Sequence, residues 1–323
     1  MRTLSFFFVL LVLITGCQPS DSTTGTQYPS RPITYLVPWN PGGGTDTISR
    51  TLAAVLQEEL GASINVVNRS GGGGVVGHLA LSSARPDGYT LGAITGEITM
   101  MHWQGLTPLR HTDFTPLALL SHNPGAITVR ADAPWNNLDE LLAEIRSNPG
   151  DLLASGTSKG GIWDLARIGF LDAAGLPESS LPWVPSQGAA PALQELLANG
   201  VHVVTAALAE TDALLKAGEV KVLAVMADNR LEAYPDIPTL KEQGIDWAIG
   251  GWVTIGAPAD LPPEVAKTLT DAILKVTQDS AYTTPLKKAG FNLTTTSGDA
   301  LNTFFQNEDE TNGKLLEMAG VTQ

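Results

Sequence analysis

Two glycine-rich stretches have the residue types and spacing that could do chemistry in this chain. The first, "VPWNPGGGTDTISR" from Val37 to Arg50, places three consecutive glycines between an apolar run and a helical pattern. The second, "LLASGTSKGGIWDLAR" from Leu152 to Arg167, repeats that order. The first N–H groups of a helix have no intrahelical partner, its N-terminus is partially positive, and glycine lets the backbone aim those groups at a ligand. Both loops therefore predict an anion site, and a strand-to-helix turn without a ligand is the alternative.

Helix-capping residues are present in both stretches. Thr45 and Asp46 are candidates to cap the first helix, and Ser158 or the neighbouring glycines are candidates to open the second. In the second helix Ile162 and Leu165 begin an apolar stripe. Because the two stretches match, we expect them to lie on two lobes and to face each other across a cleft.

Nucleotide chemistry fits neither loop. A phosphate-binding P-loop needs Gly-Lys-Ser or Gly-Lys-Thr, and neither stretch contains it. The segment "SGGGGVVG" from Ser70 to Gly77 contains the letters of a dinucleotide fingerprint, but the acid expected about 20 residues later would fall near Glu97, past the next strand. We therefore exclude a nucleotide and expect no cofactor.

Catalytic signatures are also missing from the sequence. Ser155 and Ser158 lack the G-x-S-x-G elbow, and the single cysteine, Cys17, lies near the N-terminus. The five histidines show no metal-ligand spacing: His78, His102, His111, His122 and His202. With 33 acidic against 19 basic residues, a formal charge of −14, the chain also lacks the basic surface that nucleic acid requires. We expect a protein that is not an enzyme and that binds neither metal nor nucleic acid.

The N-terminus has the pattern of a secretory signal. Arg2 precedes an apolar run from Leu4 to Leu13, which is too short for a membrane span of about 20 residues. The run ends in "LITGC", which resembles the lipobox of bacterial lipoproteins. We predict a signal peptide over residues 1–16, an acylated Cys17 that holds the protein at a membrane of the cell envelope, and a polar tether over 17–27. An ordinary signal peptide with an unrelated cysteine is the alternative.

The rest of the chain alternates between short apolar runs and helical patterns. About 300 residues remain after the leader, which usually form two lobes. Expected strands cover 33–38, 64–67, 89–94, 152–155, 201–206 and 220–227. Expected helices cover 47–60, 191–200, 211–218 and 261–276, the first of them ending at Gly61. This alternation predicts an α/β fold with mainly parallel sheets covered by helices.

A series of motifs resembles one known family over essentially the whole mature chain. In order they are "VPWNPGGGTD", "VVNRSGGGGVVG", "PDGYTLG", "FTPLALL", "LASGTSKGG", "GAAPALQELLANGVHVV", "LAVMADNR", "YPDIPTLKEQG" and "GAPADLPPEV". They are similar to the substrate-binding proteins of tripartite tricarboxylate transporters, the Bug or TctC-like family. The resemblance implies a two-lobed periplasmic-binding-protein fold of the Venus-flytrap, type II-like kind. It implies a discontinuous lobe one over 28–120 and 247–323, and a lobe two over 121–246.

The resemblance also implies a ligand site made mainly of backbone and hydroxyl groups in facing loops. Lys159 and Trp163 stand where many relatives carry other residues, so a solvated lysine and a packing tryptophan are alternatives there; packing is also the alternative for Trp39. The implied ligand-binding residues are Trp39, Asn40, Gly42, Gly43, Gly44, Thr45, Asp46, Thr95, Gly96, Ser155, Gly156, Thr157, Ser158, Lys159, Gly160, Gly161, Trp163, Gln187, Gly188 and Ala209.

The function implied by this resemblance is solute capture outside the cytoplasmic membrane. A monomeric lipoprotein in the periplasm would bind a small di-, tri- or aromatic carboxylate and deliver it to the permease subunits of a tripartite transporter. A receptor that presents its ligand to a signalling kinase is an alternative from another class. A secreted enzyme on the same fold is a third hypothesis, which the missing nucleophile and base disfavour.

Overall fold

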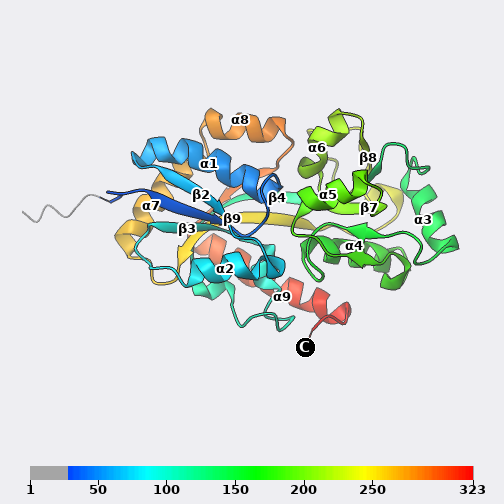
Figure 1. Ribbon diagram of the computed structural model, residues 1–323, viewed down its shortest axis with the longest axis horizontal. Coiled ribbons are helices and arrows are strands. Elements are labelled where there is room, and N and C mark those ends of the chain that lie inside the picture. Colours follow the sequence, from blue (N-terminus) through cyan, green and yellow to red (C-terminus); the bar gives the residue numbers. More distant parts are fainter. Residues whose placement is uncertain (1–27, 323) are drawn as a thin grey trace, which may run out of the picture.

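The computed structural model describes residues 28–322. The predicted signal peptide, Cys17 and the tether lie outside this range. Between residues 28 and 322 no helix is both long enough and apolar enough to cross a membrane. The described chain is an α/β fold of two lobes, joined by one long strand that pairs with strands of both lobes and by the return of the chain into a second strand of lobe one (Figure 1).

Lobe one is built on strands from both ends of the chain. β1 (Ile33–Val37) pairs in parallel with β2 (Ile64–Asn68) and β3 (Thr90–Thr95). The helices of this lobe are α1 (Gly44–Leu60), α2 (Val75–Ser82), α7 (Pro263–Val276), α8 (Ser280–Lys288) and α9 (Gly298–Met318). The first four lie in the left half of Figure 1, and α9 extends below the middle of the molecule toward lobe two.

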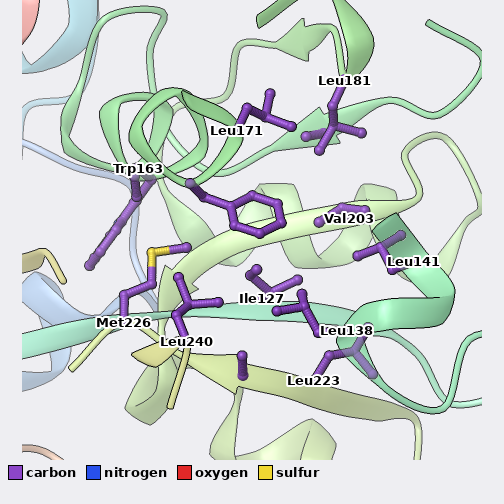
Figure 2. Packing of buried hydrophobic residues seen from close by; sticks show 14 of the residues in the cluster. Ile127, Leu138, Leu141, Trp163, Leu171, Leu181, Val203, Leu223, Met226 and Leu240 are labelled. Atoms are coloured by element: carbon purple, nitrogen blue, oxygen red, sulfur yellow. The ribbon is translucent and has the colours of Figure 1, made fainter. Parts of the chain in front are cut away.

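Lobe two comes from the middle of the chain. β5 (Ala154–Ser155) pairs in parallel with β6 (Trp183–Val184) and with β7 (Val203–Ala207). The remaining elements are α3 (Leu138–Ser147), α4 (Ile162–Ala173), α5 (Ala189–Leu197), α6 (Leu208–Lys216) and β8 (Val220–Val225). Buried apolar side chains such as Ile127, Phe170 and Leu223 form the core of this lobe, and Trp163 lies beside Met226 at its edge (Figure 2).

The two connecting strands make the sheet mixed rather than mainly parallel. β4 (Phe114–Arg130) pairs antiparallel with β9 (Gly250–Pro258) up to Pro124, and from Gly125 onward with β7 and β8. β9 also runs antiparallel to β3, and β10 (Leu293–Thr296) antiparallel to β4. The prediction of mainly parallel pairing was wrong, because it did not include one strand long enough to serve both lobes. We divide the lobes where β4 exchanges partners, at Pro124 and Gly125, and where the chain returns at Gly250.

Local sequence explains the positions of the main helices. α1 buries Ile48, Leu52 and Leu56 on one face and ends at Gly61, whose φ of 63° is the left-handed conformation that glycine favours. α7 starts at Pro263, as expected for a first-turn proline, and buries Leu269, Ile273 and Val276. These helix faces fix the orientation of the loops that precede them.

Candidate functional site

The loop before α1 is held by its own aspartate. The N–H of Gly42 donates to Oδ2 of Asp46 at 3.0 Å, and Nε of Arg50 donates to both carboxylate oxygens at 3.0 Å. Nδ2 of Asn68 donates to Oδ1 of Asp46 at 2.8 Å. Gly43 is the N-cap, and no side chain caps the helix within its own lobe. Asp46 therefore stabilises the loop by accepting its N–H group from within α1. Neither Thr45 nor Asp46 caps the helix, contrary to our expectation.

The loop before α4 has the same internal construction. The N–H of Gly160 donates to Oδ2 of Asp164 at 2.9 Å, and Arg167 donates to Oδ1 through Nε at 2.9 Å and through a terminal nitrogen at 2.6 Å. Gly161 is the N-cap. Gly42 and Gly160 both have positive φ, 89° and 68°, and each precedes its aspartate by four residues. The internal similarity seen in the sequence is thus present in the structure, with a glycine opening each helix.

A cavity lies between the two loops. It has a volume of about 60 Å³, enough for a few water molecules or a compact solute. Ten of the predicted ligand-binding residues lie on its wall: Trp39, Asn40, Gly43, Gly44, Thr45, Thr95, Gly96, Thr157, Trp163 and Gly188. The wall thus contains residues from both lobes, and the facing arrangement expected from the sequence is present.

The other ten predicted residues lie off the cavity wall: Gly42, Asp46, Ser155, Gly156, Ser158, Lys159, Gly160, Gly161, Gln187 and Ala209. Several have other partners or surroundings. Oγ of Ser155 donates to the carbonyl of Val184 at 2.7 Å, and Lys159 and Gln187 are exposed. Ala209 is buried among apolar residues of lobe one. Their assignment as ligand contacts stays a prediction.

The lobes touch across the cleft at several points. The N–H of Asn40 donates to the carbonyl of Gln187 at 3.4 Å, and Nε2 of Gln104 donates to the carbonyl of Gly160 at 2.9 Å. Farther from the cavity, Nζ of Lys216 donates to the carbonyl of Lys288 at 3.1 Å. The described conformation is therefore one in which the lobes are closed on each other.

Glu210, which the sequence reasoning missed, reaches across the cleft. It lies in the first turn of α6 in lobe two, and Oε1 accepts the N–H of Gly44 in lobe one at 2.8 Å. Oε2 accepts the N–H of Ala207 at 3.1 Å. Burial raises the pKa of Glu210 above its usual range, and the nearby charge of Glu97 raises it further. One N–H group of the predicted anion loop is thus already occupied by a carboxylate of the protein.

Glu97 is placed in lobe one as Glu210 is in lobe two: each lies near the start of a helix of the opposite lobe. The sequence reasoning missed Glu97 as well. It follows β3 in lobe one, is 4% exposed, and lies close enough to the N–H of Ile162, the first residue of α4, for that group to lower its pKa. Burial outweighs this effect and raises the pKa of Glu97. Oγ1 of Thr95 donates to Oε2 of Glu97 at 2.6 Å and accepts Nε1 of Trp39 at 3.2 Å. A single acid inside a short apolar segment has no spacing pattern, so the sequence offered no signal for either glutamate.

His78 supports the same wall from behind. It is fully buried, its Nδ1 lies 2.8 Å from the carbonyl of Gly74, and its Nε2 accepts the N–H of Thr95 at 3.3 Å. These partners fix the neutral form with the proton on Nδ1. Burial lowers the pKa of His78 to about 4. His78 therefore has a positioning role next to Thr95 and does not lie on the cavity wall.

The cavity wall contains no lysine, arginine or histidine. Within residues 28–322 no three or more histidine, cysteine, aspartate or glutamate side chains come together in a way that could hold a metal ion. The polar part of the wall consists of backbone N–H groups, amide and hydroxyl side chains and the two glutamates. Such a wall can bind a small polar solute by hydrogen bonds.

The proteins that this chain resembles in sequence and in structure include solute receptors. The sequence profile of the tripartite tricarboxylate transporter family receptor, TctC, matches residues 48–321. A UPF0065 protein of Bordetella pertussis is 31% identical over 305 residues, which cover 94% of each chain. The structure of the periplasmic binding protein BugD has a TM-score of 0.85 and 27% identity, covering 91% of this chain and 99% of that one. The structure of Rpa4515 of R. palustris with adipate has a TM-score of 0.85 and 28% identity, covering 91% and 99%. The chain therefore belongs to the TctC receptor family of tripartite tricarboxylate transporters.

Proposed function

We propose that this protein captures a small carboxylate in the cleft between its lobes. The observation that carries the proposal is the convergence of the N-termini of α1, α4 and α5 on one small cavity. Helix N-termini attract anions through their free N–H groups and their dipoles. The related Rpa4515 structure contains adipate, which supports a carboxylate as the ligand class.

Capture and release require the lobes to separate. The cavity is small and both lobes contribute to its wall, so a ligand enters only after cross-cleft contacts such as those of Asn40 and Gln104 have opened. β4 and β9 are the connections around which we expect a hinge motion, near Gly125 and Gly250.

Delivery to a membrane permease completes the proposed role. Membership of the receptor family supports a permease of the tripartite type as the partner. We propose that the receptor works in the periplasm, held at a membrane by lipid on Cys17, which follows the apolar leader directly. A tether from Cys17 to Tyr28 would let the closed receptor reach its permease.

A thermal-shift screen of the full-length protein against mono-, di- and tricarboxylates tests this function. Because a ligand that binds only the folded state stabilises it, at least one acid should raise the unfolding temperature in a concentration-dependent way. Neutral sugars and alcohols of similar size serve as controls and should have no effect. If no carboxylate stabilised the protein while an uncharged solute did, the proposed function would be wrong.

A further inference from the structure

The charges on the cavity wall point to a second feature of the ligand. Glu97 and Glu210 both line the cavity, and no cationic side chain does. Neither glutamate forms an ion pair with any residue in the range 28–322. A carboxylate removed from water is normally paired with a cation, because desolvating an isolated charge is costly. The partner missing from this wall is a positive group.

The contacts that the glutamates already make leave room for such a group. Glu210 accepts one N–H on each oxygen, from Gly44 and Ala207. Glu97 accepts the hydroxyl of Thr95 and faces the N–H of Ile162. A carboxylate has about four lone-pair sites, so each of the two can accept further hydrogen bonds from a donor in the cavity. Both carboxyl groups line the same small cavity, so one donor group in it can contact both.

A different part of the wall is suited to an anion. The N-terminus of α5 has Gly188 as its N-cap, and no side chain caps it. Within the described part of the chain, no acceptor takes the N–H of Ala189 or Ala190, both of which line the cavity. Thr157 lies on the same wall, is 4% exposed, and its Oγ1 has no hydrogen-bond partner among the described residues. A buried hydroxyl without a partner next to free N–H groups indicates a ligand acceptor at this point.

We propose that the ligand is a compact zwitterion, with one carboxylate bound by the α5 N-terminus and Thr157 and one ammonium group bound between Glu97 and Glu210. This inference rests on the proposed function and narrows its ligand class. A dicarboxylate of the adipate type would place its second negative charge against the glutamates, where like charges repel. The volume of about 60 Å³ favours a small amino or imino acid over an extended one.

Matched acids that differ only in the nitrogen test the inference. Binding to the full-length protein is measured by calorimetry for succinate, 4-aminobutyrate and butyrate, for L-proline and cyclopentanecarboxylate, and for each standard amino acid beside its hydroxy-acid analogue. At least one ammonium acid should bind about tenfold more tightly, or better, than its partner without nitrogen. If no ammonium acid bound, or if the acids without nitrogen bound as tightly as the ammonium acid in every series, the inference would be overturned.

Isosteric variants then assign the two ends of the ligand. Glu97→Gln and Glu210→Gln should each reduce the preference for the ammonium acid by about tenfold or more, while Glu219→Gln, an exposed acid in lobe two, should not change it. Thr157→Val should weaken both members of a pair alike, because it removes a contact to the carboxylate. A preference that survived in both glutamine variants would refute the assignment.

The outcomes separate this inference from the proposed function. Tight binding of acids without nitrogen, unchanged in Glu97→Gln and Glu210→Gln, would overturn the zwitterion and leave the carboxylate receptor standing. Absence of binding for every acid would contradict both. The selectivity of the unaltered protein is sufficient for the decision even if one variant does not fold.

Discussion

Mild acid should destabilise this protein through His78. The side chain is fully buried and neutral, and burial lowers its pKa from 6.5 to about 4. Between pH 6.5 and about pH 4, His78 is protonated in the unfolded chain but stays neutral in the folded protein. The free energy of unfolding therefore decreases as the pH falls through this range. Above pH 6.5 His78 is neutral in both states and has no effect. The full shift corresponds to about 3 kcal/mol at 1.36 kcal/mol per pKa unit.

The structure explains why the folded state rejects the proton. Nε2 of His78 accepts the N–H of Thr95, while Nδ1 is directed at the carbonyl of Gly74. A proton on Nε2 would face the N–H of Thr95 and remove an acceptor from a buried site. Because Thr95 lies on the cavity wall, protonation should also loosen the hydrogen bonds from Trp39 and to Glu97.

Urea unfolding of the native protein and of His78→Asn at pH 7 and pH 4.5 measures the effect. Asparagine can still donate to Gly74 but cannot titrate. The native protein should lose about 2 kcal/mol more than the variant between the two pH values, from the two pKa values and the linkage relation. Other groups titrate in both proteins and cancel in the difference. Equal pH dependence in the two proteins, or an imidazole signal in NMR that titrates near pH 6.5, would refute the reasoning.

Four further outcomes are expected. Arg167→Met should cost about 3–5 kcal/mol of unfolding free energy, because it leaves the buried Asp164 unpaired. Arg50→Met removes the half-exposed arginine that pairs with Asp46 in the other loop and should cost about 1 kcal/mol or less. Equal losses in urea unfolding would contradict this difference. Gly156→Ala should cost about 1–3 kcal/mol, since its Cβ would overlap the carbonyl oxygen of Thr205; a thermal-unfolding midpoint equal to that of the native protein would count against it. Cys17→Ser should abolish labelling by a fatty-acid analogue, and an unlabelled native protein would disprove the anchor. Saturating ligand should reduce the radius of gyration in small-angle scattering, unless the free protein is already closed in solution.

The sequence was informative where a pattern is local. Apolar spacing and Gly61 predicted α1 and its end, although the helix begins at Gly44 and not at Thr47. The first three positions carry no apolar residue, so the hydrophobic pattern could not detect them. The two glycine-rich stretches were identified correctly as strand-to-helix loops, because a position between a strand and a helix is a local feature. The first helix opens at Gly43 and not at Thr45 or Asp46, and of the two alternatives for the second helix the structure has a glycine, Gly161.

The sequence was less informative where contacts join distant segments. Proline and glycine in a sequence usually mark turns or the ends of strands and helices. β4 contains Pro116, Pro124 and Gly125, yet all three lie within one strand that serves two lobes. Pro116 pairs with β9 next to an irregularity of that ladder, Pro124 is the last residue of β4 paired with β9, and Gly125 is where β7 takes over. Such a strand becomes visible only when both of its partners are known.

The loops before α1 and α4 also show why the ligand's charge could not be predicted from the loop sequences. Each helix N-terminus faces a carboxyl group of the opposite lobe: Glu210 for α1 and Glu97 for α4. Closure of the cleft therefore supplies each loop with a carboxyl group of the protein itself. The loops retain less capacity for a ligand carboxylate than their glycines suggest. Of the three helices whose N-termini converge on the cavity, the one without such a carboxyl is α5, whose N-cap Gly188 was among the implied ligand-binding residues only through the family resemblance. Anion binding in this cleft thus depends on which N-terminus the closed protein leaves free, and that is a property of the assembled lobes and not of any one motif.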